Sequence, residues 1–206
     1  YIASLKKINY EYVFNKKKRN NIIFTGKLNS SKGYDIFLKS VIRILDKYPN
    51  WTATAVGNEP REKFVDTHKR LKIIGWKRHK DILSLYNQSS ISVVPSKWEE
   101  PFGRTSMESA AYGCATITSK NGGLTETFDN DLILPQCNST ELFKILESLI
   151  RNKSLLKKIQ LKNFKNVKHR IDIQVDKLDR IKNFFLMNNV FFFKKQRKKI
   201  LHISNF

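Results

Sequence analysis

The chain has 206 residues, and 40% of them are hydrophobic, which is enough for one large domain or for one domain with extensions. Lysine and arginine number 39 against 18 acidic residues, giving a formal net charge of +21. Such a charge is typical of proteins with an anionic partner: a nucleic acid, an acidic membrane or a phosphorylated ligand. An A/T-biased coding sequence explains it equally well, because the basic residues are spread along the whole chain.

The cysteines and histidines argue against a zinc site. Cys114 and Cys137 lack the spacing of metal ligands, and the four histidines are scattered. No signal peptide opens the chain, and no apolar run reaches the length of a membrane span. We therefore expect a cytoplasmic protein, with attachment to the cytoplasmic face of a membrane as the alternative.

Short apolar segments alternate with amphipathic ones along the chain. Residues 1–20 are basic and weakly patterned, and we interpret them as a lead-in that ends in a linker. Period-two or continuous apolar runs predict strands at 21–26, 51–56, 71–75, 91–96, 115–118 and 132–135. Helical spacing predicts helices at 34–48, 61–70, 79–88, after Gly103, at 139–152 with Ser139 as its cap, and as one or two basic helices over 154–190.

This alternation predicts an α/β fold, a Rossmann-like parallel sheet with helices on both faces and a helical C-terminal extension. Ligands of such sheets bind at the carboxyl ends of the strands, at a topological switch point. The loops that directly follow the strands are therefore the informative ones. Each of them contains a glycine, a basic residue or both.

The first of these loops is "GKLNSSKG", residues 26–33. Lys27 and Lys32 follow a strand and precede a helix, so two ammonium groups and the amides of the helix start could hold a diphosphate. The loop is not a Walker A motif, whose lysine follows the second glycine. A solvated loop in a lysine-rich protein is the alternative.

The densest stretch is "WEEPFGRTSMESAAYGC", residues 98–114. Thr105 and Glu108 match a capping box, which would explain Glu108 without a ligand. The box does not explain Glu100, which follows the fourth strand where ligands bind, or Gly103, which permits close approach of a ligand to the backbone. A glycosidase pair of Glu100 and Glu108 is a further alternative. The basic loops favour a phosphate-bearing ligand over it.

Together these motifs resemble the C-terminal, donor-binding domain of GT-B glycosyltransferases of family 4 type, the glycosyl transferases group 1. The resemblance covers roughly residues 21–155. It is carried by "GKLNSSKG", "VGNEP", "IIGW", E-P-F-G, the E-x7-E spacing of Glu100 and Glu108, and the later G-G-x-x-E. The E-x7-E spacing alone is weak, but all of these motifs in this order are specific.

The resemblance implies a role for each matching residue. Lys27, Lys32 and Glu100 would be catalytic, the lysines holding the donor diphosphate and Glu100 contacting the donor sugar. The donor would also contact Gly26, Trp76, Lys77, Phe102, Gly103, Arg104, Thr105 and Glu108, with Glu108 on the ribose hydroxyls. Two positions depart from the family pattern. Lys27 replaces an arginine and loses bidentate geometry, and Arg104 replaces an apolar residue.

The resemblance also implies a function. Residues 21–170 would be a nucleotide-sugar-binding domain and 171–196 a basic helical extension, while 197–206 would be either the first strand of a further domain or a frayed tail. The domain would transfer a hexose from a nucleoside diphosphate sugar to an unknown acceptor, with retention, in surface polysaccharide or glycolipid synthesis.

The same resemblance defines the expected partners and rivals. We expect no cofactor and no metal, and the N-terminal GT-B domain that completes the cleft is missing from residues 1–20. Contact with an anionic membrane stays open, and no specific nucleic acid is expected. The alternatives are a basic nucleic-acid-binding module, which lacks any known reader motif, and a phosphorylase-like GT-B domain.

Overall fold

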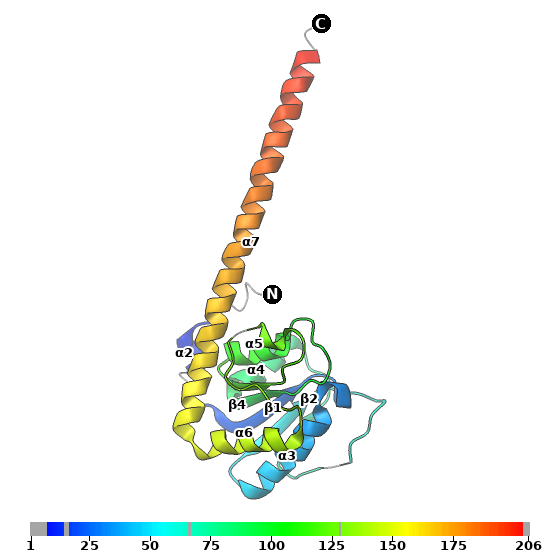
Figure 1. The fold of residues 1–206 in the computed structure, drawn as a ribbon, viewed down its shortest axis with the longest axis vertical. Helices are drawn as coiled ribbons and strands as arrows, with labels where there is room; N and C mark the ends of the chain where they lie inside the picture. The colour runs from blue at the N-terminus through cyan, green and yellow to red at the C-terminus, as the bar shows by residue number, and fades with distance from the viewer. Residues whose placement is uncertain (1–7, 15–16, 66, 128, 204–206) are drawn as a thin grey trace.

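A five-stranded parallel sheet forms the centre of the protein, as the sequence predicts (Figure 1). The computed structural model describes residues 8–14, 17–65, 67–127 and 129–203, with side chains as far as residue 186. The strand order is β3-β2-β1-β4-β5. The strands are β1 (Arg19–Thr25), β2 (Thr52–Val56), β3 (Leu71–Ile74), β4 (Ser89–Val94) and β5 (Ala115–Thr118).

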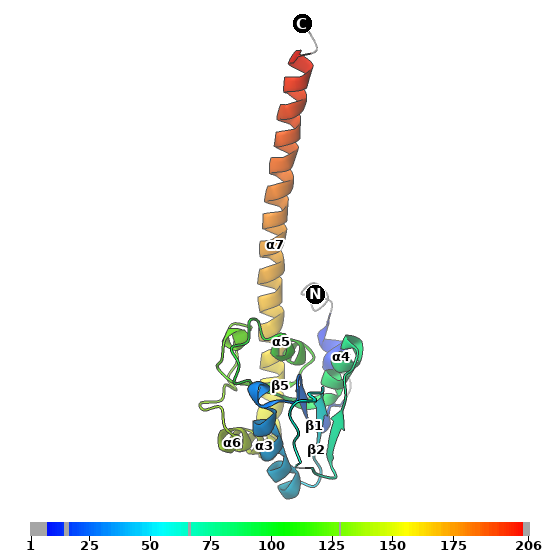
Figure 2. The ribbon, with the colours of Figure 1, turned by 90° about the vertical axis from the view of Figure 1, so that its right-hand side faces the viewer.

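Helices cover both faces of the sheet, which confirms the predicted doubly covered α/β fold (Figures 1 and 2). On one face lie α3 (Tyr34–Lys47) and α6 (Ser139–Arg151). On the other lie α4 (His79–Gln88) and α5 (Arg104–Ala111). A short helix, α2 (Tyr10–Phe14), and two 3-10 turns, η1 (Ser30–Lys32) and η2 (Gly123–Thr125), complete the globular part.

Each face is held by its own apolar cluster. The predicted face of α3 is buried in full and packs on β1, β2 and α6, through Ile36, Phe37, Ser40, Val41, Ile44 and Leu45. On the opposite face, Tyr86 of α4 packs with Ile23 and Val56. Alternate residues of β1 thus face opposite clusters, as expected for a strand buried on both sides.

The chain leaves β1 and β4 toward opposite faces of the sheet. It leaves β1 through α3 to reach β2, and it leaves β4 through α5, on the other face, to reach β5. β1 and β4 are neighbours, with Ile22 opposite Ile91 and Ile23 opposite Ser92. This is the topological switch point, and the loops after β1 and β4 therefore emerge side by side at one edge.

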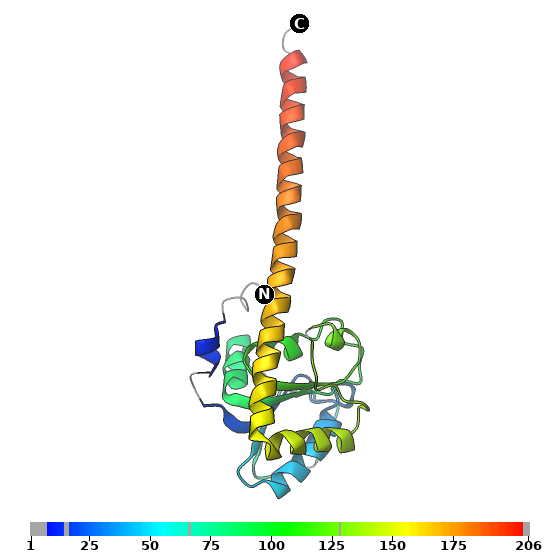
Figure 3. The ribbon, with the colours of Figure 1, turned by 60° about the vertical axis from the view of Figure 1, so that its left-hand side comes forward.

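The last helix, α7 (Lys153–Ile203), contains 51 residues. It passes the edge of the sheet next to α5 and β5 and then extends far beyond the domain (Figure 3). The strand expected within 197–206 is therefore wrong as far as Ile203, because the helix continues without a break. Residues 204–206 lie outside the described residues. Over the described part of the chain, no helix is both long and apolar enough to cross a membrane.

Three local predictions are corrected by tertiary contacts. No helix forms over the described residues of 61–70, because their side chains make tertiary contacts instead: Glu62 accepts hydrogen bonds from Ser30, and Phe64 packs against Tyr34, while Val65 is 90% exposed. The strand expected at 132–135 is reduced to an isolated bridge between Thr118 and Ile133. The cap of α6 is Asn138, whose side chain accepts a hydrogen bond from the Glu141 amide, and not Ser139.

The lead-in is also more ordered than its sequence pattern indicates. Ile8 and Val13 are buried against α5 and α7, together with Met107 and Phe164. The linker expected before residue 21 is in part the beginning of β1, at Arg19. Residues 1–7, 15 and 16 lie outside the described residues.

Lys18 ties this segment to the ends of two helices. Its Nζ donates hydrogen bonds to the carbonyl oxygens of Tyr86, Asn87, Ser89 and Tyr112, at 2.7 to 3.3 Å. These carbonyls belong to the C-terminal ends of α4 and α5, where the helix dipole favours a cation. Burial lowers the pKa of the ammonium group, partly offset by the nearby Cys114 thiol.

We predict that Lys18→Met lowers the free energy of unfolding by about 2 to 3 kcal/mol, because it leaves buried carbonyl oxygens without their donor. Chemical denaturation measures this change. Lys17→Met is the matched control, since Lys17 is exposed next to it. Equal stability of the two variants would show that the four contacts of Lys18 contribute nothing.

Candidate functional site

Two adjoining cavities lie at the carboxyl ends of the strands. The first, about 340 Å³, is lined by residues that follow β1, β2 and β3 and by Glu108 of α5. The second, about 130 Å³, lies between the loops after β1 and β4. Both are lined by Thr25, Gly26 and Thr105, so they are two parts of one site.

Nine of the eleven predicted site residues line these two cavities. The larger cavity contains Lys27, Trp76, Lys77 and Glu108, and the smaller contains Lys32, Glu100 and Arg104, with Gly26 and Thr105 shared. Trp76 is 72% exposed at the mouth of the larger cavity. The fold thus brings together predicted residues from three separate loops, those after β1, β3 and β4, and from α5.

Lys32 and Glu100 form an ion pair in the smaller cavity. Lys32 Nζ lies 2.7 Å from Glu100 Oε1, and their side chains are 29% and 15% exposed. The backbone of Glu100 is fixed from behind, because its carbonyl oxygen accepts a hydrogen bond from the Gly123 amide and it bridges to Gly122. A cation and a carboxylate are thus held face to face at the switch point.

The turn that carries Lys32 is fixed at several points. The side chain of Asn29 accepts a hydrogen bond from the Lys32 amide at 3.0 Å. Glu62 accepts hydrogen bonds from both the amide and the hydroxyl group of Ser30, at 2.8 and 2.6 Å. Gly33 follows at φ 70°, with room for no more than a hydrogen, because a Cβ there would stand 1.9 Å from the Pro95 carbonyl oxygen.

Glu108 is buried in the larger cavity, with 5% of its side chain exposed. Its Oε1 lies 2.7 Å from His79 Nε2 and 3.4 Å from the guanidinium of Arg104. The predicted capping box is wrong: the cap of α5 is Gly103, and Thr105 lies inside the helix. Capping of α5 therefore does not account for Glu108.

His79 is a site residue that the sequence interpretation missed. It begins α4, next to the loop after β3, and its pairing with Glu108 links two segments 29 residues apart. Its place two residues after Lys77, at the end of the same post-strand segment, was the available signal. Nothing in the spacing indicated that α4 and α5 would bring His79 and Glu108 together.

Phe102 and Gly103 do not line either cavity. Phe102 is 44% exposed beside the site. Gly103 has φ 72°, and a Cβ added there would meet Leu124 at 2.9 Å and Thr127 at 3.1 Å. Its conformation and packing against the loop after β5 account for a glycine at this position without contact to a ligand.

Among the described residues, no three or more histidine, cysteine, aspartate or glutamate side chains lie together in a way that could hold a metal ion. One Asp-x-Asp triplet occurs in the sequence, Asp129–Asp131. Asp131 pairs with Lys162 of α7 at 2.7 Å, and the Asn130 side chain donates to the Thr116 carbonyl. Neither aspartate lines the two cavities. A metal-free site stays a prediction.

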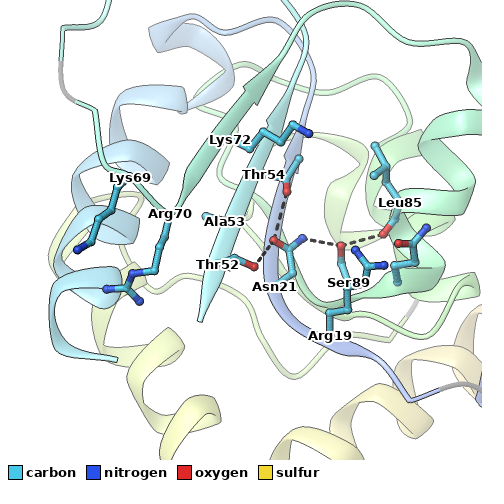
Figure 4. Close-up of a pocket in the computed structure, with 11 residues that line it drawn as sticks. Arg19, Asn21, Thr52, Ala53, Thr54, Lys69, Arg70, Lys72, Leu85 and Ser89 are labelled. Atoms are coloured by element: carbon cyan, nitrogen blue, oxygen red, sulfur yellow. Dashed lines mark hydrogen bonds between the residues drawn. The ribbon is translucent and has the colours of Figure 1, made fainter. Parts of the chain in front are cut away.

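A third pocket, of about 350 Å³, lies beside α4 toward the amino ends of β1 and β2 (Figure 4). Its floor is a closed polar network in which Asn21 accepts from Thr52 and Thr54 and donates to Ser89. The guanidinium of Arg70 donates to backbone carbonyls of Leu45, Tyr48 and Trp51. This pocket is remote from the candidate site.

The fold is an α/β domain with two adjoining cavities at the switch point of a parallel sheet. The model of the family "Glycosyl transferases group 1" matches residues 7–169. The chain therefore belongs to this glycosyltransferase family, which confirms the resemblance seen in the sequence.

Individual relatives agree with this assignment. An uncharacterized 41.2 kDa protein in the cps region of Klebsiella pneumoniae is 28% identical over 147 residues, which cover 71% of this chain and 40% of that protein. The C-terminal domain of a glycosyl transferase group 1 family protein from Francisella tularensis has a TM-score of 0.66 and 26% identity, covering 79% of this chain and 92% of that domain.

A more distant structure has the same fold. HepE of Anabaena, solved with UDP, has a TM-score of 0.64 and 19% identity, covering 85% of this chain and 54% of that one. The neighbours are GT-B glycosyltransferases. The chain spans 40% or less of the length of the first curated relatives that it matches.

We predict that Gly33→Ala lowers the free energy of unfolding by about 2 kcal/mol or more, because a Cβ at positive φ collides with the Pro95 carbonyl. Gly75→Ala is the matched control, since nothing lies within 4 Å of its added Cβ. Thermal unfolding of both variants measures the difference. A Gly33→Ala protein as stable as the Gly75→Ala protein would contradict the close approach of the two loops.

Proposed function

We propose that the chain is the donor-binding domain of a glycosyltransferase, which binds a nucleoside diphosphate sugar across the two adjoining cavities. The observation that carries the proposal is the way charged side chains are divided between the two cavities. A buried carboxylate, Glu108, lies in the larger cavity, and the Lys32–Glu100 pair lies in the smaller one. A nucleoside fits the first arrangement and a sugar diphosphate fits the second.

The larger cavity has the chemistry of a nucleoside site. Trp76 and Tyr86 give it aromatic surface, and Val56 and Ile82 give it apolar walls. A carboxylate accepts hydrogen bonds only, so Glu108 is suited to the vicinal hydroxyl groups of a ribose. We assign the base to the side of Trp76 and Lys77 and the ribose to Glu108.

The smaller cavity has the chemistry to stabilise a leaving diphosphate. Lys32 and Arg104 line this cavity, Lys27 lines the adjoining larger one, and α5 begins at Arg104, so the partial positive charge of a helix start lies beside the same space. Bond cleavage at the sugar leaves negative charge on the diphosphate, and preorganised cations lower the energy of that state. A phosphate competes with Glu100 for Lys32, so donor binding would release Glu100 toward the sugar.

The relatives support this proposal at the level of the donor. HepE has been solved with UDP, with UDP and glucose, and with UDP-glucose. A hexose as the transferred sugar, retention at the anomeric carbon, a metal-free reaction and an unknown acceptor follow from the family resemblance and stay predictions. The same holds for a second GT-B domain that would complete the cleft and for contact with an anionic membrane.

Binding of nucleotides to the 206-residue chain tests the proposal. We expect at least one of uridine, guanosine or adenosine diphosphate to bind at millimolar concentration or better, measured by titration calorimetry and thermal shift. Salt-sensitive binding of RNA without nucleotide binding would favour the nucleic-acid alternative. Absence of any heat or shift with all three nucleotides would overturn the proposed function.

The two glutamates are expected to act on different parts of the donor. Glu108→Gln should weaken the bare nucleoside diphosphate about tenfold, or roughly 1.4 kcal/mol, because a charged acceptor of the ribose is lost. Glu100→Gln should weaken the nucleotide sugar more than the bare diphosphate. Dissociation constants of both ligands for both variants measure this difference. Unchanged affinities in both variants would leave the two carboxylates without a role in donor binding.

A further inference from the structure

Glu108 is a buried carboxylate, and its orientation depends on the hydrogen-bond donors around it. A carboxylate with 5% exposure loses most of its hydration and requires hydrogen-bond donors from the protein. Those donors also decide the direction in which the carboxylate faces. Their geometry therefore determines whether the group is ready for a ligand.

Two donors converge on the same oxygen, Oε1 of Glu108. His79 Nε2 lies at 2.7 Å, and the guanidinium of Arg104 lies at 3.4 Å, near the limit of a hydrogen bond. Because a carboxylate can only accept, Nε2 of His79 is the protonated nitrogen of this pair. The shorter contact is that of His79.

The two donors also differ in mobility. Arg104 lies one turn before Glu108 on the same helix, and its side chain is 59% exposed. His79 reaches Glu108 from the first residue of α4; its side chain is 45% exposed, and its ring has only two rotatable bonds. His79 therefore contacts the carboxylate through fewer internal rotations than Arg104 does.

We propose that His79 is a positioning residue for the nucleotide ribose. It holds Oε1 of Glu108, and the carboxylate, which can accept about four hydrogen bonds, retains capacity for the ribose hydroxyl groups. His79 does not line the cavity, so it acts through Glu108 and does not touch the ligand. The inference rests on the proposed function, because it requires a nucleoside in the larger cavity.

Two probes separate a positioning role from a structural one. Uridine diphosphate carries both ribose hydroxyl groups, and its 2′,3′-dideoxy analogue carries neither. We expect His79→Leu to weaken uridine diphosphate about fivefold, the value of one hydrogen bond of roughly 1 kcal/mol, and to leave the dideoxy analogue unchanged. His79→Gln, which retains an N–H donor, should recover most of the affinity.

A double-variant cycle adds a second readout. If His79 acts through Glu108, His79→Leu should have no further effect on affinity in a Glu108→Gln background. Lys80→Leu is the matched control, because Lys80 is the next residue of α4 and is exposed. Melting temperatures of all variants report whether the fold is intact.

The outcomes distinguish the inference from the function on which it rests. No binding of uridine, guanosine or adenosine diphosphate by the unaltered chain would overturn the function, and the inference with it. If only a diphosphate other than that of uridine binds, that nucleotide and its dideoxy analogue replace the two probes. Equal weakening of the two probes by His79→Leu, or equal effects of His79→Leu and Lys80→Leu, would overturn the inference alone.

Discussion

The pairing of β1 with β4 is the constraint on which the rest of the structure depends. The chain leaves these parallel strands toward opposite faces of the sheet, β1 through α3 and β4 through α5. No helix can cover the edge where the crossovers diverge, so the loops after both strands are left facing each other. The Lys32–Glu100 ion pair spans this gap, with Lys32 beyond β1 and Glu100 beyond β4.

The loops at this edge are held rigidly although they contain little regular structure. Glu62 and Asn29 fix the turn before Lys32, and the Gly123 amide fixes the backbone of Glu100. The segment between β2 and β3 forms no helix over its described residues. It contains Glu62 and also Phe64, whose ring packs against Tyr34. The fixed backbone of these loops holds the charged groups close together before a ligand arrives, which favours electrostatic stabilisation.

The carboxylates of the site differ in environment and therefore in the part of a ligand that each suits. Glu100 is partly exposed and paired with a lysine that a phosphate can attract away. Glu108 is nearly enclosed and held by His79 and Arg104. Glu100 is therefore suited to a place next to a diphosphate, which can take over its lysine. Glu108 is suited to accept hydrogen bonds from neutral hydroxyl groups in a fixed direction. Three of the chain's many basic residues gather at this site, because Lys32 and Arg104 line the smaller cavity and Lys27 lines the adjoining larger one.

The sequence by itself determined the sheet, its main helices, the family and most of the site. Apolar runs and helical spacing are local, and strand-end loops of a parallel sheet meet at one edge whatever their length, so nine of the predicted residues could be placed in advance. Tertiary structure alone decided the rest. The helix expected at 61–70 does not form, because this segment contacts a distant turn instead. Residues 198–203, whose pattern is short enough to fit a strand, are part of α7. The contact of His79 with Glu108 depends on how α4 packs beside α5, a geometry that no local pattern encodes.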